Sequence, residues 1–407
     1  MKKRIALILV CLALCLSWLP ACTAEPAEAA AAIVPELTIT QRPIPENEAM
    51  DYLKSMGVGW NLGNTFDAEK GDWNRNADEM TVETSWGAPK TTEQVMIALK
   101  EAGFSTVRIP VSWHDHVDAD FNISERWLAR VQEVVDWAIA QDLHVILNIH
   151  HDEYQFYPSS ERYDESARYI SAIWSQLALR FRDYDDRLIF EAMNEPRLKD
   201  TGYEWTFNPV IPACQDAEDC LNRLNQLFVD TVRASGGNNA DRYLMVPAYD
   251  AAPDNAARDT FLLPQDTADN RIIVSIHAYT PYDFALNKKG TTSFTLNNNA
   301  MKKEIVTFMN SVYNRFILQG VPVVIGEFGA MTKGDNLQAR VDWTAFYVAT
   351  ASARNLPCVW WDNAAFSGDG EIFGILNRRT GEFVFPEIVD AIITYGGYDK
   401  LPAAAQQ

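Results

Sequence analysis

The sequence predicts an α/β protein whose eight parallel strands close into a single (β/α)8 TIM barrel. Short runs rich in β-branched residues alternate with longer amphipathic stretches typical of helices. The expected strands span 58–62, 106–109, 143–149, 188–192, 243–246, 272–276, 323–325 and 357–360. The helical patterns between them include 93–102, 125–141, 165–181, 222–234, 301–319 and 337–354. Because each strand is followed by a crossover long enough for a helix, neighbouring strands should run parallel.

A doubly wound open sheet is the alternative arrangement for this pattern. It is disfavoured because no Gly-x-Gly-x-x-Gly turn follows the first strand, and because the strand count is eight. The chain has 407 residues, a length at which α/β barrels commonly fold as one domain. We therefore assign residues 46–400 to a single barrel domain without an internal linker or repeat.

The N-terminus has the pattern of a bacterial secretory signal. Three basic residues precede an apolar run over 5–19 that is too short to span a membrane. Residues 1–24 are expected to be removed, either by ordinary cleavage after Ala24 or by a lipoprotein-type cleavage before Cys22. The protein is thus expected to be secreted or to be a cell-surface lipoprotein whose contact with the membrane is a lipid on Cys22. Residues 25–45 are rich in Ala, Glu and Pro and predict a flexible tether.

Composition excludes some partners and leaves others open. The net charge of −20 argues against nucleic-acid binding, which needs clustered Lys and Arg, but it places no demand on a neutral polysaccharide ligand. The 12 Trp and 15 Tyr residues would serve equally as core filling or as stacking platforms for sugars. Cys214 and Cys220 are close enough in sequence to close a small disulfide loop, and Cys358 is expected to be a buried thiol.

Polar and aromatic residues gather at the C-terminal ends of the expected strands, where a (β/α)8 barrel builds its site. Polar side chains scattered through a barrel core would be costly, so one shared site is the simpler explanation. In strand order, the residues are Arg108, His150, Asn194, Glu195, His277, Tyr279, Glu327 and Trp361.

Glu195 and Glu327 are the candidate catalytic pair. Each follows an apolar strand, and the fourth and seventh strands face each other across the barrel mouth, so the two side chains can converge. Glycoside hydrolysis needs one carboxyl to protonate the leaving oxygen and a second to act as nucleophile or base. Two unrelated surface glutamates are the alternative, which the nearby Asn194, His277 and Tyr279 make less attractive. Asn194 is expected to hydrogen-bond the sugar 2-hydroxyl.

The remaining strand-end residues are expected to tune these two carboxyl groups. Arg108 would lower the pKa of Glu327, unless it merely braces the barrel through an ion pair. Tyr279 would donate its hydroxyl to Glu327. His277 would help to set the protonation of Glu195, whose pKa is expected to be raised because it must hold a proton beside an ionised partner.

A run of histidines and carboxylates begins at His150 and raises the question of a metal site. Adjacent residues on a strand point to opposite sides, so His150 and His151 are not expected to share one ion. Sugar contact is the preferred interpretation, and no metal or cofactor is expected. For His114 and His116 the same two interpretations, metal ligand and sugar contact, are open, whereas His144 is expected to be a core residue.

The strand-end motifs resemble those of glycoside hydrolase family 5, over about residues 47 to 395. The motifs are Asn-Glu-Pro at 194–196 and Gly-Glu-Phe-Gly at 326–329. The resemblance implies a retaining mechanism with Glu195 as acid/base and Glu327 as nucleophile. It also implies a surrounding shell of Arg108, His150, Asn194, His277, Tyr279 and a tryptophan of the eighth strand, for which we choose Trp361 over Trp360.

Three further stretches, 59–68, 83–87 and 108–114, resemble the bacterial endoglucanases of subfamily 4. The implied activity is that of an endo-acting β-1,4-glucanase on cellulose-type glucans, lichenan or xyloglucan. A β-mannanase or xylanase on the same fold is one alternative, and a non-catalytic glycan-binding protein is another. A monomer is expected. The resemblance implies that the substrate is bound by Asn61, Trp86, Trp113, His114 and His151, although core packing competes as the role of the tryptophans.

Overall fold

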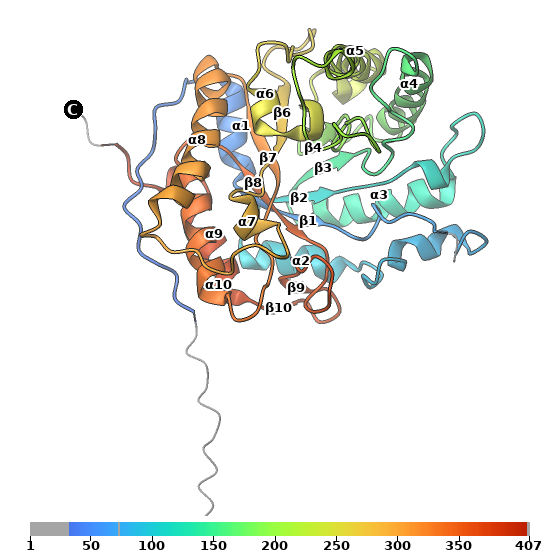
Figure 1. Ribbon diagram of the computed structural model, residues 1–407. Coiled ribbons are helices and arrows are strands. Elements are labelled where there is room, and N and C mark those ends of the chain that lie inside the picture. Colours follow the sequence, from blue (N-terminus) through green and yellow to red (C-terminus); the bar gives the residue numbers. More distant parts are fainter. Residues whose placement is uncertain (1–31, 72–73, 405–407) are drawn as a thin grey trace, which may run out of the picture. The chain divides into compact units, whose positions relative to one another are not determined.

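Eight parallel strands close into a barrel in the order of the sequence, from β1 to β8 (Figure 1). The computed structural model describes residues 32–71 and 74–404. Strand β8 closes the barrel onto β1 over five residue pairs. The predicted barrel is therefore confirmed, and the open sheet is excluded. The strands are β1 (Val58–Leu62), β2 (Thr106–Ile109), β3 (His144–Asn148), β4 (Leu188–Glu191), β5 (Leu244–Pro247), β6 (Ile272–His277), β7 (Val323–Phe328) and β8 (Cys358–Asp362).

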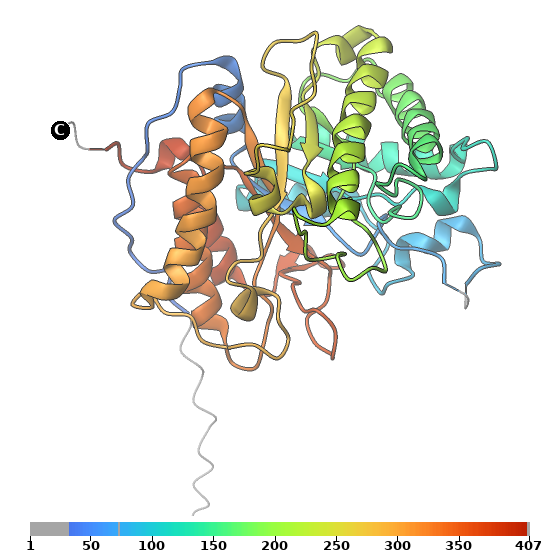
Figure 2. The same ribbon diagram turned by 45° about the horizontal axis from the view of Figure 1, so that its top comes forward.

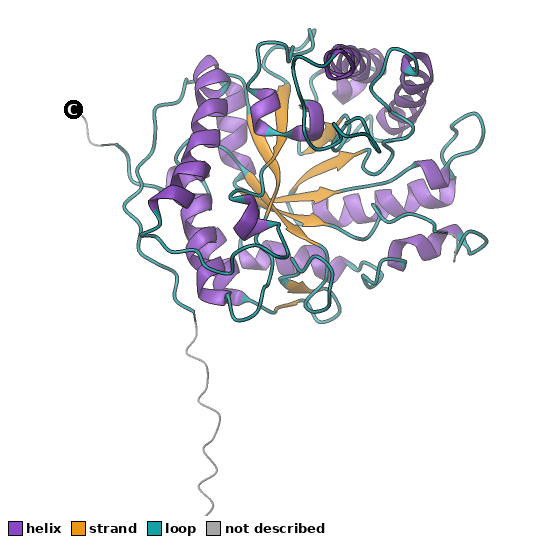
Figure 3. Cartoon of the chain, in the orientation of Figure 1, coloured by secondary structure: helices purple, strands orange, loops and turns teal. Residues whose placement is uncertain are grey.

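Helices surround the strands on the outside of the barrel (Figure 3). Helices α4 and α5 lie side by side, as both views of the ribbon show (Figure 2). The longer helices are α1 (Glu48–Met56), α2 (Glu93–Ala102), α3 (Glu125–Ala140), α4 (Tyr163–Arg180), α5 (Pro212–Ala234), α8 (Asn299–Arg315), α9 (Leu337–Ser352) and α10 (Pro386–Tyr395). The crossover after β5 contains only the short elements η4 (Tyr249–Ala251) and α6 (Pro253–Ala256) before β6 begins.

Further short elements lie in the loops. They are η1 (Glu79–Thr84), η2 (His114–His116), η3 (Gly237–Ala240), α7 (Tyr282–Ala285), η5 (Ile317–Gln319), β9 (Leu376–Asn377), β10 (Glu382–Phe383) and η6 (Tyr398–Lys400). The last two strands pair antiparallel in the loop that follows β8.

The strands are buried on both faces, as expected for a parallel sheet covered by helices. All residues of β1, β2, β4, β6, β7 and β8 are buried. Most are apolar, so the charged residues Arg108 in β2 and Glu191 in β4 stand out as members of the barrel interior. Their positions mark the floor of the site described below.

The segment before α1 is ordered along part of its length. Gln41 N–H donates to Pro402 O at 2.8 Å, and Arg42 N–H donates to Ala353 O at 2.7 Å. Leu37 N–H donates to the hydroxyl of Tyr395 at 3.0 Å. The expected flexible tether over 25–45 is therefore wrong from residue 32 onward, because its backbone groups find partners on the C-terminal part of the chain. The rest of the tether and the leader 1–24, including Cys22, lie outside the described residues.

The cysteines of α5 do not form the disulfide that their spacing suggested. Cys214 and Cys220 are free and buried. Both lie on one helix, where residues six apart are rotated by about 240° about the axis, so their side chains point in different directions. Cys358 is a free buried thiol, as expected. No helix in the described part of the chain has the length and apolarity needed to cross a membrane.

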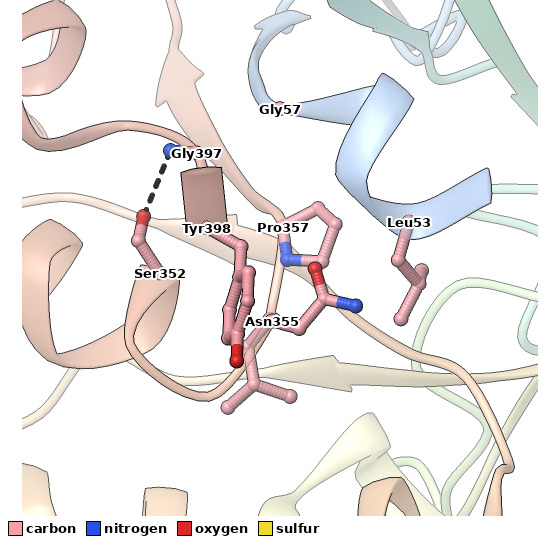
Figure 4. A pocket seen from close by; sticks show the side chains of 8 residues that line it. Leu53, Gly57, Ser352, Asn355, Pro357, Gly397 and Tyr398 are labelled. Atoms are coloured by element: carbon pink, nitrogen blue, oxygen red, sulfur yellow. Dashed lines mark hydrogen bonds between the residues drawn. The ribbon is translucent and has the colours of Figure 1, made fainter. Parts of the chain in front are cut away.

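A small cavity lies near the N-terminal ends of β1 and β8 (Figure 4). Its volume is about 10 Å³, and Leu53, Asn355, Pro357 and Tyr398 contribute to its lining. Such a volume holds at most about one water molecule. Beside it, Gly397 N–H donates to Ser352 Oγ at 3.0 Å, which joins the C-terminal segment to α9 (Figure 4). The cavity is a packing defect at the end of the barrel opposite the candidate site.

Candidate active site

Arg108 organises the floor of the barrel mouth. Its guanidinium is fully buried and makes four short contacts with side chains on β1, β4 and β7 and in the loop after β4. Burial alone would lower the pKa of Arg108, but its two carboxylate partners, Glu191 and Glu327, raise it. Arg108 therefore stays charged and holds its acceptors in place. The contacts are Nε to Glu191 Oε2 at 2.7 Å, Nη1 to Glu327 Oε1 at 2.7 Å, Nη1 to Asn61 Oδ1 at 3.0 Å and Nη2 to Asn194 Oδ1 at 2.8 Å.

Glu327 lies within β7, which extends to Phe328 beyond the predicted end of the strand. While Arg108 binds its Oε1, the hydroxyl of Tyr279 donates to its Oε2 at 2.9 Å. Burial, followed by the charges of Glu327 and Glu195, raises the pKa of Tyr279 well above its usual value, so the phenol keeps its proton. Both oxygens of Glu327 are thus oriented by hydrogen-bond donors.

Glu195 lies beyond β4 and faces Glu327 across the site. His277 Nδ1 lies 2.8 Å from Glu195 Oε1 and 3.7 Å from Glu327 Oε1. A carboxylate only accepts, so His277 Nδ1 carries a proton and donates it to Glu195. Burial lowers the pKa of His277, but the charge of Glu327 and the hydrogen bond with Glu195 raise it overall. The histidine therefore bridges the two glutamates.

The separation of the two carboxylates is short. One oxygen of Glu195, one nitrogen of His277 and one oxygen of Glu327 all lie within 4.8 Å of one another. Retaining glycosidases place their carboxyl groups about 5 to 5.5 Å apart, whereas inverting enzymes need about 6.5 to 9.5 Å to admit a water. The close approach of these two oxygens favours the retaining arrangement over the inverting one.

The pKa of Glu195 differs from the sequence-based expectation. Burial raises it, but the hydrogen bond from His277 and the charges of His277 and Arg197 outweigh burial and lower the pKa. The expected raised pKa was therefore wrong for the protein without substrate. His277, a predicted strand-end residue, has the larger lowering effect, and Arg197, which was not predicted, adds to it.

His150 and Trp361 form the wall beside Tyr279. Their rings are parallel within 3° with centroids 5.7 Å apart. Asn148 Nδ2 lies 3.1 Å from His150 Nδ1, which places the imidazole proton on Nε2. Burial, and then the charges of His151 and Arg108, lower the pKa of His150 far below its usual value, so it is neutral. Trp360 instead packs against Phe328 and Trp343 in the core, which supports the choice of Trp361.

Two residues expected to bind substrate are structural instead. Trp113 is fully buried, and its indole N–H donates to Asn148 O at 2.9 Å. Asn61 is also fully buried, and its amide accepts from Arg108 and donates to Gly326 O at 2.9 Å. Neither side chain has surface exposed to the barrel mouth, and the polar atoms of both are turned inward to backbone and side-chain partners.

Trp86 and His151 lie together at the edge of the site. Trp86 is 40% exposed, and its ring lies 5.6 Å from that of His151. Burial lowers the pKa of His151, but Glu153, 3.4 Å from its Nδ1, raises it overall. The pair therefore offers a ligand the aromatic face of Trp86 and the polar ring of His151.

His114 and His116 have opposite environments although one residue separates them. His114 Nδ1 lies 2.5 Å from Asp152 Oδ1, and its side chain is 24% exposed. Burial lowers its pKa, but Asp152 and then other carboxylates raise it to about 9. His116 is buried, stacked on Trp127 at 3.6 Å, and burial lowers its pKa to about 3. Only His114 is therefore placed to meet a ligand.

Two groups of side chains have the kinds of ligand atom that bind a metal ion. They are Asp67 with His150 and His151, and Glu195 with His277 and Glu327; in each group the donor atoms lie within 4.8 Å of one another. The expectation that His150 and His151 point to opposite sides was wrong. Strand β3 ends at Asn148, so the alternation of a strand does not apply to the two histidines that follow it.

The family comparison agrees with the geometry. Residues 69–367 match the family model of cellulase (glycosyl hydrolase family 5). The chain belongs to glycosyl hydrolase family 5. The family predicted from the strand-end motifs is thereby confirmed. Endoglucanase B of Ruminococcus albus is 42% identical over 90% of this chain and 86% of its own. Endoglucanase A of Clostridium longisporum is 40% identical over 88% of this chain and 68% of its own.

Solved structures of family 5 enzymes superpose on the barrel. A lichenase from Caldicellulosiruptor sp. F32 has 49% sequence identity and a TM-score of 0.87, covering 89% of this chain and 99% of its own. A broad specificity endoglucanase from Ruminococcus champanellensis with bound cellotriose has 43% identity and a TM-score of 0.80, covering 86% of this chain and all of its own (100%).

Several residues that shape this family 5 site were not predicted. Glu191 is fully buried and accepts from Ser275 Oγ at 2.6 Å and from Asn148 Nδ2 at 3.1 Å. The sequence did contain a sign of this role, because Glu191 is a carboxylate inside an apolar strand. A buried charge without a partner is costly, so such a residue implies a buried cation nearby. Arg197, which lies 3.0 Å from Glu153 and 4.0 Å from Glu195, follows a loop proline and offered no such signal.

Proposed function

We propose that this protein is an endo-acting retaining β-1,4-glucanase that hydrolyses β-glucans with Glu195 and Glu327. The observation that carries the proposal is the approach of the two carboxylates to within 4.8 Å across the barrel mouth, with His277 between them. Arg108 and Tyr279 orient one carboxylate, and His277 holds the other.

In the first step, Glu327 attacks the anomeric carbon while a proton on Glu195 passes to the departing glycosidic oxygen. Arg108 and Tyr279 orient the attacking carboxylate, so little reorganisation is needed when the covalent bond forms. In the second step, Glu195 takes a proton from water, which attacks the glycosyl-enzyme and releases Glu327. Two inversions at the same carbon leave its configuration unchanged.

Other residues around the scissile bond bind the sugar. Asn194 uses its Oδ1 to accept from Arg108, which leaves its Nδ2 as the donor for the 2-hydroxyl. His150 is neutral and offers its Nε2–H to a sugar hydroxyl. Trp361, stacked with His150 and in contact with Tyr279, forms the apolar wall against which the sugar ring packs.

Further from the scissile bond, Trp86, His151 and His114 form the candidate binding surface for neighbouring sugars. Trp86 supplies a partly exposed aromatic face. His114 supplies a charged donor at neutral pH. Lichenase and broad specificity endoglucanases are among the similar structures, and one is described as xyloglucan-specific. We therefore propose mixed-linkage and β-1,4-linked glucans as the substrate class, and no contact in the site favours mannan or xylan instead.

We further propose that the protein acts as a monomer outside the cell, either freely secreted or attached through a lipid on Cys22. The basic and apolar leader supports export. Mass spectrometry of the mature chain tests this proposal, since lipidation predicts an acylated N-terminal cysteine, whereas ordinary cleavage predicts a start at residue 25. Light scattering tests the oligomeric state.

Reducing-sugar release from carboxymethylcellulose, lichenan, xyloglucan, xylan and mannan tests the activity directly. The wild type should cut at least one β-glucan, and excess chelator should not change the rate. Glu327→Ala should abolish turnover while leaving glucan binding nearly intact. Cleavage of mannan or xylan alone would contradict the substrate class. Binding without cleavage of any polysaccharide would instead favour the non-catalytic glycan-binding protein.

A further inference from the structure

Glu153 is a fully buried carboxylate in the loop that follows β3, and the mechanism above does not use it. Its Oε1 accepts a hydrogen bond from Arg197 Nη1 at 3.0 Å, and its Oε2 accepts from Lys199 Nζ at 3.0 Å. Its Oε1 also lies 3.4 Å from His151 Nδ1. Burial raises the pKa of Glu153, but His151, and then Arg197 and Lys199, lower it overall, so the group stays ionised. One buried charge therefore binds two cations of the loop that carries the acid/base.

Several acceptors share the donors of Arg197, which follows Glu195 by two residues. Besides its bond to Glu153, Arg197 Nη1 donates to the backbone oxygen of Glu195 at 2.8 Å. A terminal nitrogen of a guanidinium has two N–H groups, so both of those on Nη1 are engaged. Its Nε donates to Glu204 Oε1 at 3.2 Å, and the guanidinium carbon lies 4.0 Å from the ring centroid of Trp205. Arg197 is thus fixed in one position beside the acid/base.

The carboxyl group of Glu195 lies just beyond hydrogen-bond reach of this guanidinium. Arg197 Nη1 is 4.0 Å from Glu195 Oε2, whereas His277 Nδ1 is 2.8 Å from Glu195 Oε1. Because Oε1 accepts from His277, Oε2 is the oxygen left to carry the acid proton. A cation hydrogen-bonded to Oε2 would favour the ionised carboxylate and take the place of that proton. The position of Arg197 therefore bears directly on proton donation.

We propose that Glu153 is a positioning residue for the acid/base, which occupies Arg197 and so keeps the guanidinium from pairing with Glu195 Oε2. This inference rests on the proposed function, in which Glu195 protonates the departing oxygen. Glu153 is fully buried, so it acts through Arg197 and not on the substrate. Without this carboxylate, one N–H of Nη1 loses its acceptor, and a small movement of the guanidinium brings that N–H to Glu195 Oε2, now 4.0 Å from Nη1. An ion pair then replaces the acid proton.

A glutamine at position 153 breaks this arrangement with little change in side-chain size. Glu153 has two acceptor oxygens and uses one for each cation. The amide of glutamine has one acceptor oxygen, and its nitrogen only donates, so it cannot serve both Arg197 and Lys199. The loss of charge also weakens whichever hydrogen bond remains. Glu153→Gln should therefore loosen the hold on Arg197.

The test compares kcat/KM of Glu153→Gln and wild type on two substrates. Cleavage of a soluble β-glucan needs protonation of the departing oxygen, whereas the phenolate of a 2,4-dinitrophenyl β-cellobioside departs without it. General acid catalysis contributes about 100- to 10,000-fold, so kcat/KM should fall about tenfold or more on glucan and stay within about twofold on the aryl substrate. Glu153→Asp keeps the charge but withdraws it by one methylene, and it should show the same selective loss to a smaller degree. It replaces Glu153→Gln in the test if thermal unfolding shows that the glutamine variant does not fold.

Two further variants separate proton donation from structural damage. Lys199→Gln removes the second cation but leaves the pair between Glu153 and Arg197, so the ratio of the two kcat/KM values should match that of wild type. Glu153→Gln combined with Arg197→Gln removes the guanidinium as well and should restore that ratio. An equal loss on both substrates, wild-type values on both, or a double variant as selective as Glu153→Gln would overturn the inference. Failure of the wild type to cut any glucan would contradict the proposed function instead.

Discussion

Arg108 and Glu191 form a fully buried ion pair beneath the two catalytic candidates, with Nε and Oε2 2.7 Å apart. Glu191 also accepts from Ser275 at 2.6 Å, so three strands meet at this carboxylate. The pair determines where the remaining nitrogens of Arg108 point, and these hold Glu327 and Asn194. The position of the nucleophile therefore depends on a residue that does not touch substrate.

Removal of Glu191 should be costly for stability. In Glu191→Ala, Arg108 loses a buried partner, and breaking a buried pair in this way costs about 3–5 kcal/mol. Denaturant unfolding would measure the difference in free energy of unfolding. Glu101→Ala removes an exposed glutamate on α2 and should change the free energy of unfolding by less than about 0.5 kcal/mol. Equal stability of the two variants would contradict the role given to the pair.

Tyr279→Phe tests the hydrogen bond to Glu327 Oε2. The phenol stays protonated and donates at 2.9 Å, and a hydrogen bond to a charged group is worth about 1.5–3 kcal/mol. Because the nucleophile is then held by Arg108 alone, kcat/KM should fall about 10- to 100-fold, with an unchanged thermal midpoint. Steady-state kinetics and thermal unfolding provide the two measurements. A wild-type kcat/KM would show that Tyr279 does not orient the nucleophile.

Trp86→Ala should weaken binding without affecting chemistry. The ring is 40% exposed and lies next to His151 at the edge of the site, while the two carboxylates are held by His277 and Tyr279. KM for long glucans should rise about tenfold, which corresponds to about 1.4 kcal/mol, while kcat stays within twofold. Leu179→Ala, an exposed apolar residue on α4, serves as the control. A loss confined to kcat would assign Trp86 to the reacting centre.

His116 should make the fold sensitive to acid. Burial, followed by the charges of Lys70 and His114, lowers its pKa to about 3, whereas an unfolded histidine titrates near pH 6.5. Below about pH 6.5 the unfolded chain binds a proton that the folded chain refuses, so stability falls as pH drops toward 3. His116→Phe keeps the stacking on Trp127 and removes the titration. Its thermal midpoint should fall less between pH 7 and 4; parallel curves would disprove the effect.

The parts of the structure that follow from local pattern were predictable. The alternation of apolar runs and amphipathic stretches predicts all eight strands, because parallel strands are buried on both faces and read as continuous apolar runs. Glu195 and Glu327 were found because both stand at strand ends. Glu327 nevertheless lies inside β7, since the apolar run stops three residues before the hydrogen-bonded strand does.

Other features depend on contacts between distant parts of the chain. Trp113 and Asn61 turn their polar atoms inward to Asn148, Gly326 and Arg108, and only the closed barrel brings these partners together. The influence of His277 on Glu195 was predicted from the strand ends, whereas Arg197, which adds to the lowering of that pKa, follows a loop proline and gave no signal.

The order in the segment before α1 likewise depends on the distant Tyr395 and Pro402. Ala and Pro predict a tether only when no such partners exist.

The anomeric configuration of the first products tests the central claim most directly. Proton NMR during cleavage of a soluble β-glucan, recorded before mutarotation, distinguishes retention from inversion. The spacing of Glu195 and Glu327 within 4.8 Å predicts that the β-anomer accumulates first. Initial accumulation of the α-anomer would show that water attacks the substrate directly, and it would contradict the assignment of Glu327 as the nucleophile.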